Sequence, residues 1–291
     1  MKKIDEAFVR RINDILIEHD IPIRDRPLET MFLWMQENKI VENFFELDEY
    51  DFIKQVYKKI YPNEDFSLAV LKSAIAIRDK MYNVNVPIIF GSYMIDILNL
   101  IQIKQQELEN IFQNYPEQGW RAYYGVADLV DYAYAVDDLR LEEGECSQLL
   151  EQATNNLIAT NRILSQDENL DAAVQTICIT AELSLKAVLA KFGYNEERRR
   201  NIGHNIYNLA KEIVKIKSMN SDDRFLSECG RFPNYVQSRY ISSGLSRRQL
   251  INLTMRVQFV AAEAVRRISN RNLARELEMD KLNLPRPSFD L

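Results

Sequence analysis

The stretch AAVQTICITAELSLKAVLAKFGYNEERRRNIGHNIYN, residues 172–208, decides the fold of this chain. Apolar residues recur in its first half at the three- and four-residue spacing of a buried helical face. Gly193 follows as a C-cap glycine would, three arginines at 198–200 form a predicted loop, and Gly203-His204 begins another predicted helix. The same helical period runs through most of the chain, so the sequence predicts an all-α fold.

Length and composition are those of an ordinary globular protein. The 291 residues suffice for one large domain or two ordinary ones, with 46% hydrophobic and 27% charged residues. Cys146, Cys178 and Cys229 are far apart and lack CxxC or CxxH spacing, which indicates a reducing, intracellular setting. Charges interrupt the N-terminal MKKIDEAFVRR where a signal peptide needs an apolar run. No segment approaches the roughly 18 uncharged apolar residues of a membrane span, so we expect a cytoplasmic protein without membrane contact.

Three segments are expected along the chain. The sequence LEEGE around Gly144 is the best candidate for a domain boundary. It separates an acidic all-helical domain of unknown type, 1–143, from a helical bundle, 144–276. The remainder, 277–291, contains two prolines and is expected to be an extended or disordered tail.

Local signals place individual elements. A helix is predicted from Leu68 towards Tyr82, and VNVP at 84–87 is interpreted as a loop. Ser246 and Gln249 have the spacing of a capping box, which predicts the start of the last long helix.

Charge is distributed unevenly. Residues 191–291 hold 19 basic and 11 acidic side chains, a net charge of +8, and residues 1–190 hold the other 18 basic and 32 acidic ones, a net charge of −14. The basic part is predicted to contact a polyanion, the acidic part of the same chain or the acidic part of a second copy. Arginines run from the connector before the last long helix into that helix. The candidate nucleic-acid or nucleotide contacts among them are Arg239, Arg247, Arg248 and Arg256.

Four tyrosines and several acids share the predicted helix at 120–141. The tyrosine stripe is predicted to pack in an amphipathic interface rather than to stack on bases. The acids, among them Asp128 and Asp131, are predicted to form a solvated face, with a hard-cation site as the weaker alternative.

The second half contains an ordered series of motifs. AELSLKAVLAKFG (181–193) is followed by GHNIYNLAKEI (203–213), FPNYVQSRY (232–240) and the long closing helix from Ser246. This order resembles the HEPN domain, a family of helical bundles in prokaryotic toxin–antitoxin and defence proteins and in some eukaryotic proteins. The resemblance covers about residues 144–272, under half of the chain, and implies an up-down helical bundle. The N-terminal part resembles no family that we can name.

Many HEPN members are metal-independent endoribonucleases, so the resemblance implies a candidate catalytic pair: an Arg, four to six intervening residues and a His. Arg199 has four residues between it and His204, and Arg198 has five. In such enzymes the 2′-OH of RNA attacks the adjacent phosphate, the His moves a proton, and the Arg stabilises the charge developing on phosphorus. In toxin members of the family this motif commonly continues as His-x-Tyr, but here the tyrosine stands one place later, at Tyr207. The alternative is that His204 caps or packs the start of its helix, as in family members whose third helix starts with Gly-His and which are not catalytic.

Two functions follow from these features. The first is a HEPN-like binding or scaffolding module for RNA, a nucleotide or a protein partner, in a prokaryotic defence or regulatory setting. The second is a metal-independent endoribonuclease, a toxin or antiviral effector, with Arg199 and His204 at a dimer cleft. No cofactor or metal is expected, because Gly-rich phosphate loops, GxSxG and HExxH are absent and two histidines cannot make a typical zinc site. The resemblance implies a homodimer and, as a candidate protein partner, a nucleotidyltransferase antitoxin.

Overall fold

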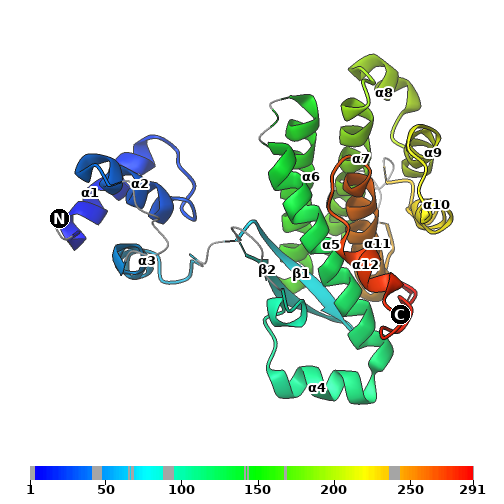
Figure 1. Ribbon diagram of the computed structural model, residues 1–291, viewed down its shortest axis with the longest axis horizontal. Coiled ribbons are helices and arrows are strands. Elements are labelled where there is room, and N and C mark those ends of the chain that lie inside the picture. Colours follow the sequence, from blue (N-terminus) through cyan, green and yellow to red (C-terminus); the bar gives the residue numbers. More distant parts are fainter. Residues whose placement is uncertain are drawn as a thin grey trace. The chain divides into compact units, whose positions relative to one another are not determined.

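Helices dominate the computed structural model, which confirms the predicted helical class, and one small β-hairpin accompanies them in the described part of the chain (Figure 1). The structure describes residues 4–40, 48–64, 66, 69–87, 95–140, 142, 144–166, 169–235 and 243–290. The chain divides into two compact units, Met1–Leu68 and Ala69–Leu291.

The described residues of the first unit form three helices. They are α1 (Glu6–Glu18), α2 (Arg26–Asn38) and α3 (Asp48–Ile60). Their apolar faces enclose a small core that includes Val9, Met31, Trp34, Ile53 and Tyr57. The polar groups buried beside this core are paired, because Arg26 donates to the Tyr61 hydroxyl at 2.9 Å and the Thr30 and Tyr57 hydroxyls lie 2.8 Å apart.

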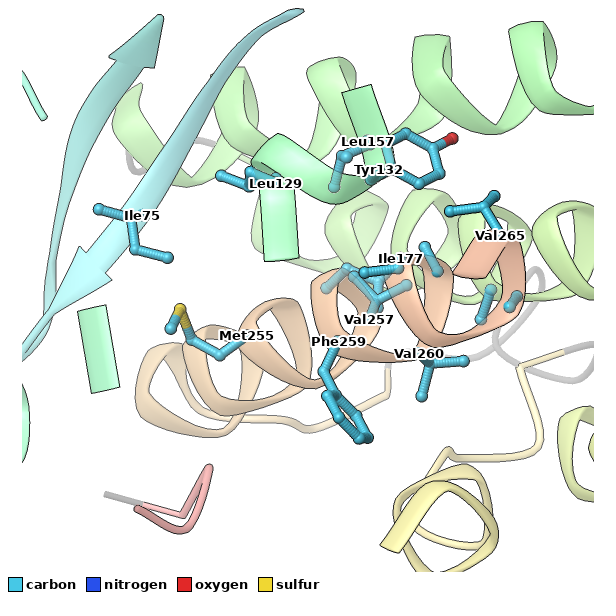
Figure 2. Packing of buried hydrophobic residues seen from close by; sticks show 14 of the residues in the cluster. Ile75, Leu129, Tyr132, Leu157, Ile177, Met255, Val257, Phe259, Val260 and Val265 are labelled. Carbon is cyan, nitrogen blue, oxygen red and sulfur yellow. The ribbon is translucent and has the colours of Figure 1, made fainter. Parts of the chain in front are cut away.

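The second unit is a helical bundle with a hairpin against it. Its elements are β1 (Leu71–Ile77), β2 (Lys80–Val86), η2 (Leu98–Leu100), α4 (Gln105–Asn114), α5 (Pro116–Arg140), α6 (Glu145–Gln166), α7 (Leu170–Lys191), α8 (Glu196–Ile202), α9 (Ile206–Ile216), α10 (Asp222–Cys229), α11 (Arg247–Arg266) and α12 (Leu273–Met279). α7 is central, because it packs against α6, α9 and α11. Figure 2 shows side chains from several of these elements meeting in one core, among them Ile75, Leu129, Leu157, Ile177 and Val257.

The hydropathy of α7 reflects its central position. Among the described helices it alone is long and apolar enough to cross a membrane, and 67% of its most apolar window is buried inside the structure. Glu182 and Lys186 interrupt the middle of α7, so it is not the run of about 18 uncharged apolar residues that the sequence was expected to lack. A helix that is apolar nearly all round is also what the centre of a large core requires.

A β-hairpin replaces the helix predicted over 68–82 and the loop predicted at 84–87. β1 pairs antiparallel with β2 down to Ile77 opposite Lys80, and Arg78 adopts a left-handed conformation, φ 58°, at the turn. β1 is buried along almost its whole length, so both of its faces are apolar. Such a strand lacks the alternation of polar and apolar residues that distinguishes a half-exposed strand from a helix.

Gly125 allows the hairpin to lie close to α5. A Cβ atom at this position would lie 2.4 Å from Ile75 Cδ1 and 2.9 Å from Met255 Cε. Gln258 on α11 also donates a hydrogen bond of 2.8 Å to the Ala74 carbonyl of β1. The hairpin is therefore part of the bundle core, where Figure 2 shows Ile75 and Met255.

The division of the structure after Leu68 differs from the boundary predicted at Gly144, between segments 1–143 and 144–276. α5 precedes Gly144, yet it packs against α11 and α12 of the bundle. Its tyrosines confirm the predicted packing role, because Tyr124 and Tyr132 are each only 1% exposed. α5 is thus a helix of the same bundle as the segment after Gly144.

The C-terminal tail lies against the bundle. The helix α12 includes residues 277–279 of the predicted tail, and residues 280–290 after it contain no helix or strand. Phe289 is buried and its ring centroid lies 5.4 Å from that of Phe259, while Asp290 pairs with Arg256 at 2.9 Å. Buried contacts therefore hold this segment in place without regular secondary structure.

Candidate functional site

His204 lies on the short link between α8 and α9. Gly203, with φ 85°, turns the chain there, and the side chain of Asn205 caps α9 by accepting from the Asn208 backbone N–H at 2.9 Å. The capping role considered for His204 is therefore wrong. Its Nδ1 instead lies 2.9 and 3.0 Å from the two carboxylate oxygens of Glu182, and 58% of its side chain is exposed.

Glu182 is the buried centre of this site. It projects from the middle of α7, and its carboxylate also accepts a 2.7 Å hydrogen bond from Lys186 and a short one from the Tyr235 hydroxyl. Burial raises the pKa of this carboxyl, but the bonds from Lys186, Tyr235 and His204 outweigh burial and hold its pKa below the ordinary value. The pair of Glu182 with Lys186, one helical turn apart, therefore belongs to a larger polar cluster.

Two hollows adjoin this cluster and share His204 and Tyr235. The first, about 340 Å³, is lined by Gln152, Asn155, Asn156, Ile179, Glu182, Leu183, His204 and Tyr235. The second, about 270 Å³, lies beside the start of α9 and the end of α10 and is lined by His204, Asn205, Ile206, Tyr207, Cys229, Gly230, Phe232, Pro233, Asn234 and Tyr235. Among these described residues there is no arginine or lysine, so the polar lining consists mainly of amides, His204 and Tyr235.

Arg199 has a structural environment. The predicted arginine loop is the short helix α8, and Arg199 faces inward from it with 4% of its side chain exposed. Its guanidinium donates to the Tyr194 carbonyl and to the Glu145 carboxylate. These bonds tie α8 to the start of α6, and Arg199 is not among the residues that line the two hollows.

Arg198 lies on the outer side of α8. Its guanidinium carbon lies 3.5 Å from the centroid of the Tyr194 ring, a cation–π contact, and the residue is exposed. Arg200 is also exposed and pairs with Glu196 one turn earlier. Of the two arginines with the motif spacing, Arg198 is therefore the one whose charge is accessible.

The four predicted nucleic-acid contacts have different environments. Arg239 falls outside the described residues. Arg256 is 5% exposed and pairs with Glu228 at 2.6 Å. Arg247 donates to the Asp79 carbonyl of the hairpin turn, and Arg248 is exposed. The three arginines that the structure describes do not form one exposed cluster, because Arg256 is buried.

Most other arginines of α11 and the tail neutralise buried acids of the same unit. Arg266, 3% exposed, pairs with Asp128 at 2.6 Å and with Asp131 at 2.7 Å, and Arg286 of the tail also binds Asp128. The prediction of a solvated acidic face is wrong for Asp128 and Asp131, which are 0% and 2% exposed, but it is confirmed for Asp137 and Asp138, which are exposed. Of the alternatives for the basic segment, pairing with acids of the same chain is the one observed for these side chains.

The site contains residues that sequence reasoning missed. Tyr235 and the amides of Gln152 and Asn155 lie far from His204 in sequence. The packing of α6 against α7 brings the two amides to the site, and Tyr235 reaches it through its hydrogen bond to Glu182. Glu182 was visible as a charge within an apolar helix, a signal for a buried, partnered group. No group of three or more His, Cys, Asp or Glu in the described ranges could hold a metal ion.

The HEPN domain family matches residues 146–266, which span α6 to α11. No curated protein and no solved structure matches the chain. The N-terminal part has no family match, and the bundle around α7 extends the matched segment at its N-terminal side by the hairpin, α4 and α5. The C-terminal part of this chain is therefore a HEPN domain.

Proposed function

We propose that this protein is a HEPN binding module that recognises RNA, a nucleotide or a protein partner at the two hollows that share His204 and Tyr235. The observation that carries the proposal is the cluster around Glu182. A buried carboxylate with three donors fixes an exposed imidazole and a hydroxyl at the boundary of two adjoining hollows. Convergent polar groups in a partly apolar hollow are typical of ligand sites.

The environment of Arg199 supports binding over cleavage. An arginine that stabilises a developing charge on phosphorus has to reach the phosphate with its guanidinium. In this chain the Arg199 guanidinium is buried and already bonded to Glu145 and Tyr194. Releasing it would leave a buried partner unsatisfied, at a cost of about 1–3 kcal/mol.

A metal-independent endoribonuclease is the second candidate, and one observation favours it. His204 is exposed and has a carboxylate behind Nδ1, the arrangement that orients imidazoles in acid–base catalysis. The accessible cation with the required spacing is Arg198, five intervening residues before His204. In this alternative a second copy brings another Arg198 to the same cleft.

One experiment separates the two functions. The purified chain is incubated in EDTA with a fluorescein-labelled single-stranded RNA, and both anisotropy and product ends are measured. Binding without cleavage, weakened by His204→Ala, is the expected result. Release of a 2′,3′-cyclic phosphate that is lost in His204→Ala would instead establish the ribonuclease, and Arg198→Ala beside Arg200→Ala would then identify its cation.

A parallel thermal-shift measurement with ATP tests the nucleotide form of the proposal. If neither RNA nor ATP binds, the proposed ligand is a protein partner. A homodimer, a nucleotidyltransferase antitoxin as partner, a role in prokaryotic defence and a cytoplasmic location are further parts of the proposal. Size-exclusion chromatography with light scattering and co-expression with a neighbouring nucleotidyltransferase test the first two.

A further inference from the structure

We infer that Glu182 is a positioning residue that holds His204 in its Nδ1–H tautomer, so that Nε2 is presented to the hollows as a hydrogen-bond acceptor. The geometry comes from two elements. Glu182 is fixed within α7, and His204 is fixed by the turn at Gly203 before α9. Nδ1 lies within 3.0 Å of both carboxylate oxygens, so this nitrogen is the one that contacts the carboxylate.

The count of donors and acceptors assigns the proton. An ionised carboxylate only accepts hydrogen bonds, and an ammonium group only donates them. Glu182 receives one bond from Lys186 and one from the Tyr235 hydroxyl. These two donors favour the ionised carboxylate, in agreement with its lowered pKa. Nδ1 of His204 must therefore carry the proton that it shares with Glu182.

The other ring nitrogen is then an acceptor. No described residue forms a hydrogen bond with Nε2 of His204, and 58% of the side chain is exposed. A histidine without such a carboxylate favours the opposite tautomer, in which Nε2 carries the proton and can only donate. Glu182 thus determines whether the exposed nitrogen of the neutral imidazole accepts or donates a hydrogen bond.

The ligand chemistry follows, and this step rests on the proposed function. A neutral His204 in this tautomer accepts a proton or a hydrogen bond, so the ligand group that it meets has to be a donor, such as a hydroxyl. Among the residues that line the first hollow, Glu182 is the only carboxylate and none is a lysine or arginine, and the 2.7 Å pair with Lys186 balances the charge of Glu182. An uncharged donor is therefore the group that this position suits best.

The tautomer can be measured directly, because the chain contains only two histidines. The full chain is labelled with ¹⁵N-histidine, and long-range ¹H–¹⁵N correlations are recorded at a pH at which the imidazoles are neutral. The variant His19→Asn assigns the spectrum, because His19 lies in the first unit and bonds the Ile15 carbonyl there. We expect His204 to show a protonated Nδ1 and an unprotonated Nε2. A predominant Nε2–H form in the unaltered site would overturn the inference.

Two variants separate positioning from a merely structural role. Glu182→Leu removes the acceptor, and the tautomer should shift towards Nε2–H. Tyr235→Phe removes another bond to the same carboxylate but leaves the His204 contact, so Nδ1–H should persist. A folded Glu182→Leu protein that keeps Nδ1–H would contradict the role of Glu182. If that variant does not fold, the spectrum of the wild-type chain still decides the tautomer. Neither result depends on RNA binding or cleavage, so the inference and the proposed function can fail separately.

Discussion

Glu263 on α11 gives the sharpest stability prediction, because its buried carboxylate lies at the centre of an ion-pair cluster. It is 1% exposed, and it contacts Arg266 and Arg275 at 2.9 Å each and accepts from the Ser221 hydroxyl at 2.6 Å. Burial by itself raises the pKa of this carboxyl, but the two arginines and the hydroxyl outweigh it and lower the pKa to about 2. The substitution Glu263→Gln keeps the shape and removes the charge.

The magnitude follows from the difference between the folded and unfolded pKa values. A fall from the ordinary 4.5 to about 2 corresponds to about 3 kcal/mol of folding free energy at neutral pH. The cost of leaving two arginines near an uncharged amide is of the same order. Glu263→Gln should therefore lower the free energy of unfolding at pH 7 by about 3 kcal/mol.

The stabilisation by Glu263 should depend on pH. Because the folded pKa is the lower one, the contribution is complete above about pH 5 and is lost as the pH falls from about 4.5 towards 2. Each pH unit within that window should remove about 1.4 kcal/mol of the difference between wild type and Glu263→Gln. Urea unfolding followed by circular dichroism at pH 7, 5, 4 and 3.5 measures this difference.

The matched control is Glu151→Gln on the exposed side of α6, which should change the unfolding free energy by less than about 0.5 kcal/mol. A Glu263→Gln protein within about 0.5 kcal/mol of wild type at pH 7 would refute the reasoning. So would a large difference that does not shrink between pH 5 and 3.5, because the loss would then arise from packing and not from charge.

Four further substitutions test other contacts by the same unfolding measurement. Arg199→Ala should lower the free energy of unfolding by about 2–3 kcal/mol, because it leaves the Tyr194 carbonyl and Glu145 without their donor. Arg198→Ala should lower it by at most about 1 kcal/mol, because it removes only a cation–π contact. Equal losses would contradict the environments assigned to the two arginines. Gly125→Val should cost about 1–3 kcal/mol through overpacking against the hairpin, and a neutral result would mean that the hairpin can move away from α5. Arg286→Ala should cost about 3 kcal/mol and expose the tail to proteolysis, and an unchanged digestion pattern would show that the apolar contacts of the tail suffice to hold it.

Much of the bundle was predictable because its signals are local. The apolar stripe of α7 and its stop at Gly193 depend on residues within a few turns of one another. The capping box of Ser246 and Gln249 is present as predicted, because a cap is a contact between residues three apart in sequence. These local patterns also carried the resemblance to the HEPN family that the match over 146–266 confirms.

The hairpin was not predictable in the same way. Its first strand is buried on both faces, and a short run of apolar residues fits a strand or a helix equally well until its neighbours are known. The two buried acids of α5, Asp128 and Asp131, were predicted to be solvated for a related reason. A carboxylate in a sequence predicts a solvated position unless a partner is known, and the partner of Asp128 is Arg266, 138 residues away.

In the candidate site, too, the local features were predictable and the long-range contacts were not. The sequence by itself determined the helical class and the order of the HEPN helices, and it singled out His204 as a candidate, since periodicity, caps and motif spacing are local. Only the tertiary structure decided that Arg199 is buried and that Glu182, Tyr235 and His204 form one cluster. The physical reason is that burial and charge pairing depend on which helix faces lie against each other, and the packing of the whole bundle selects those faces.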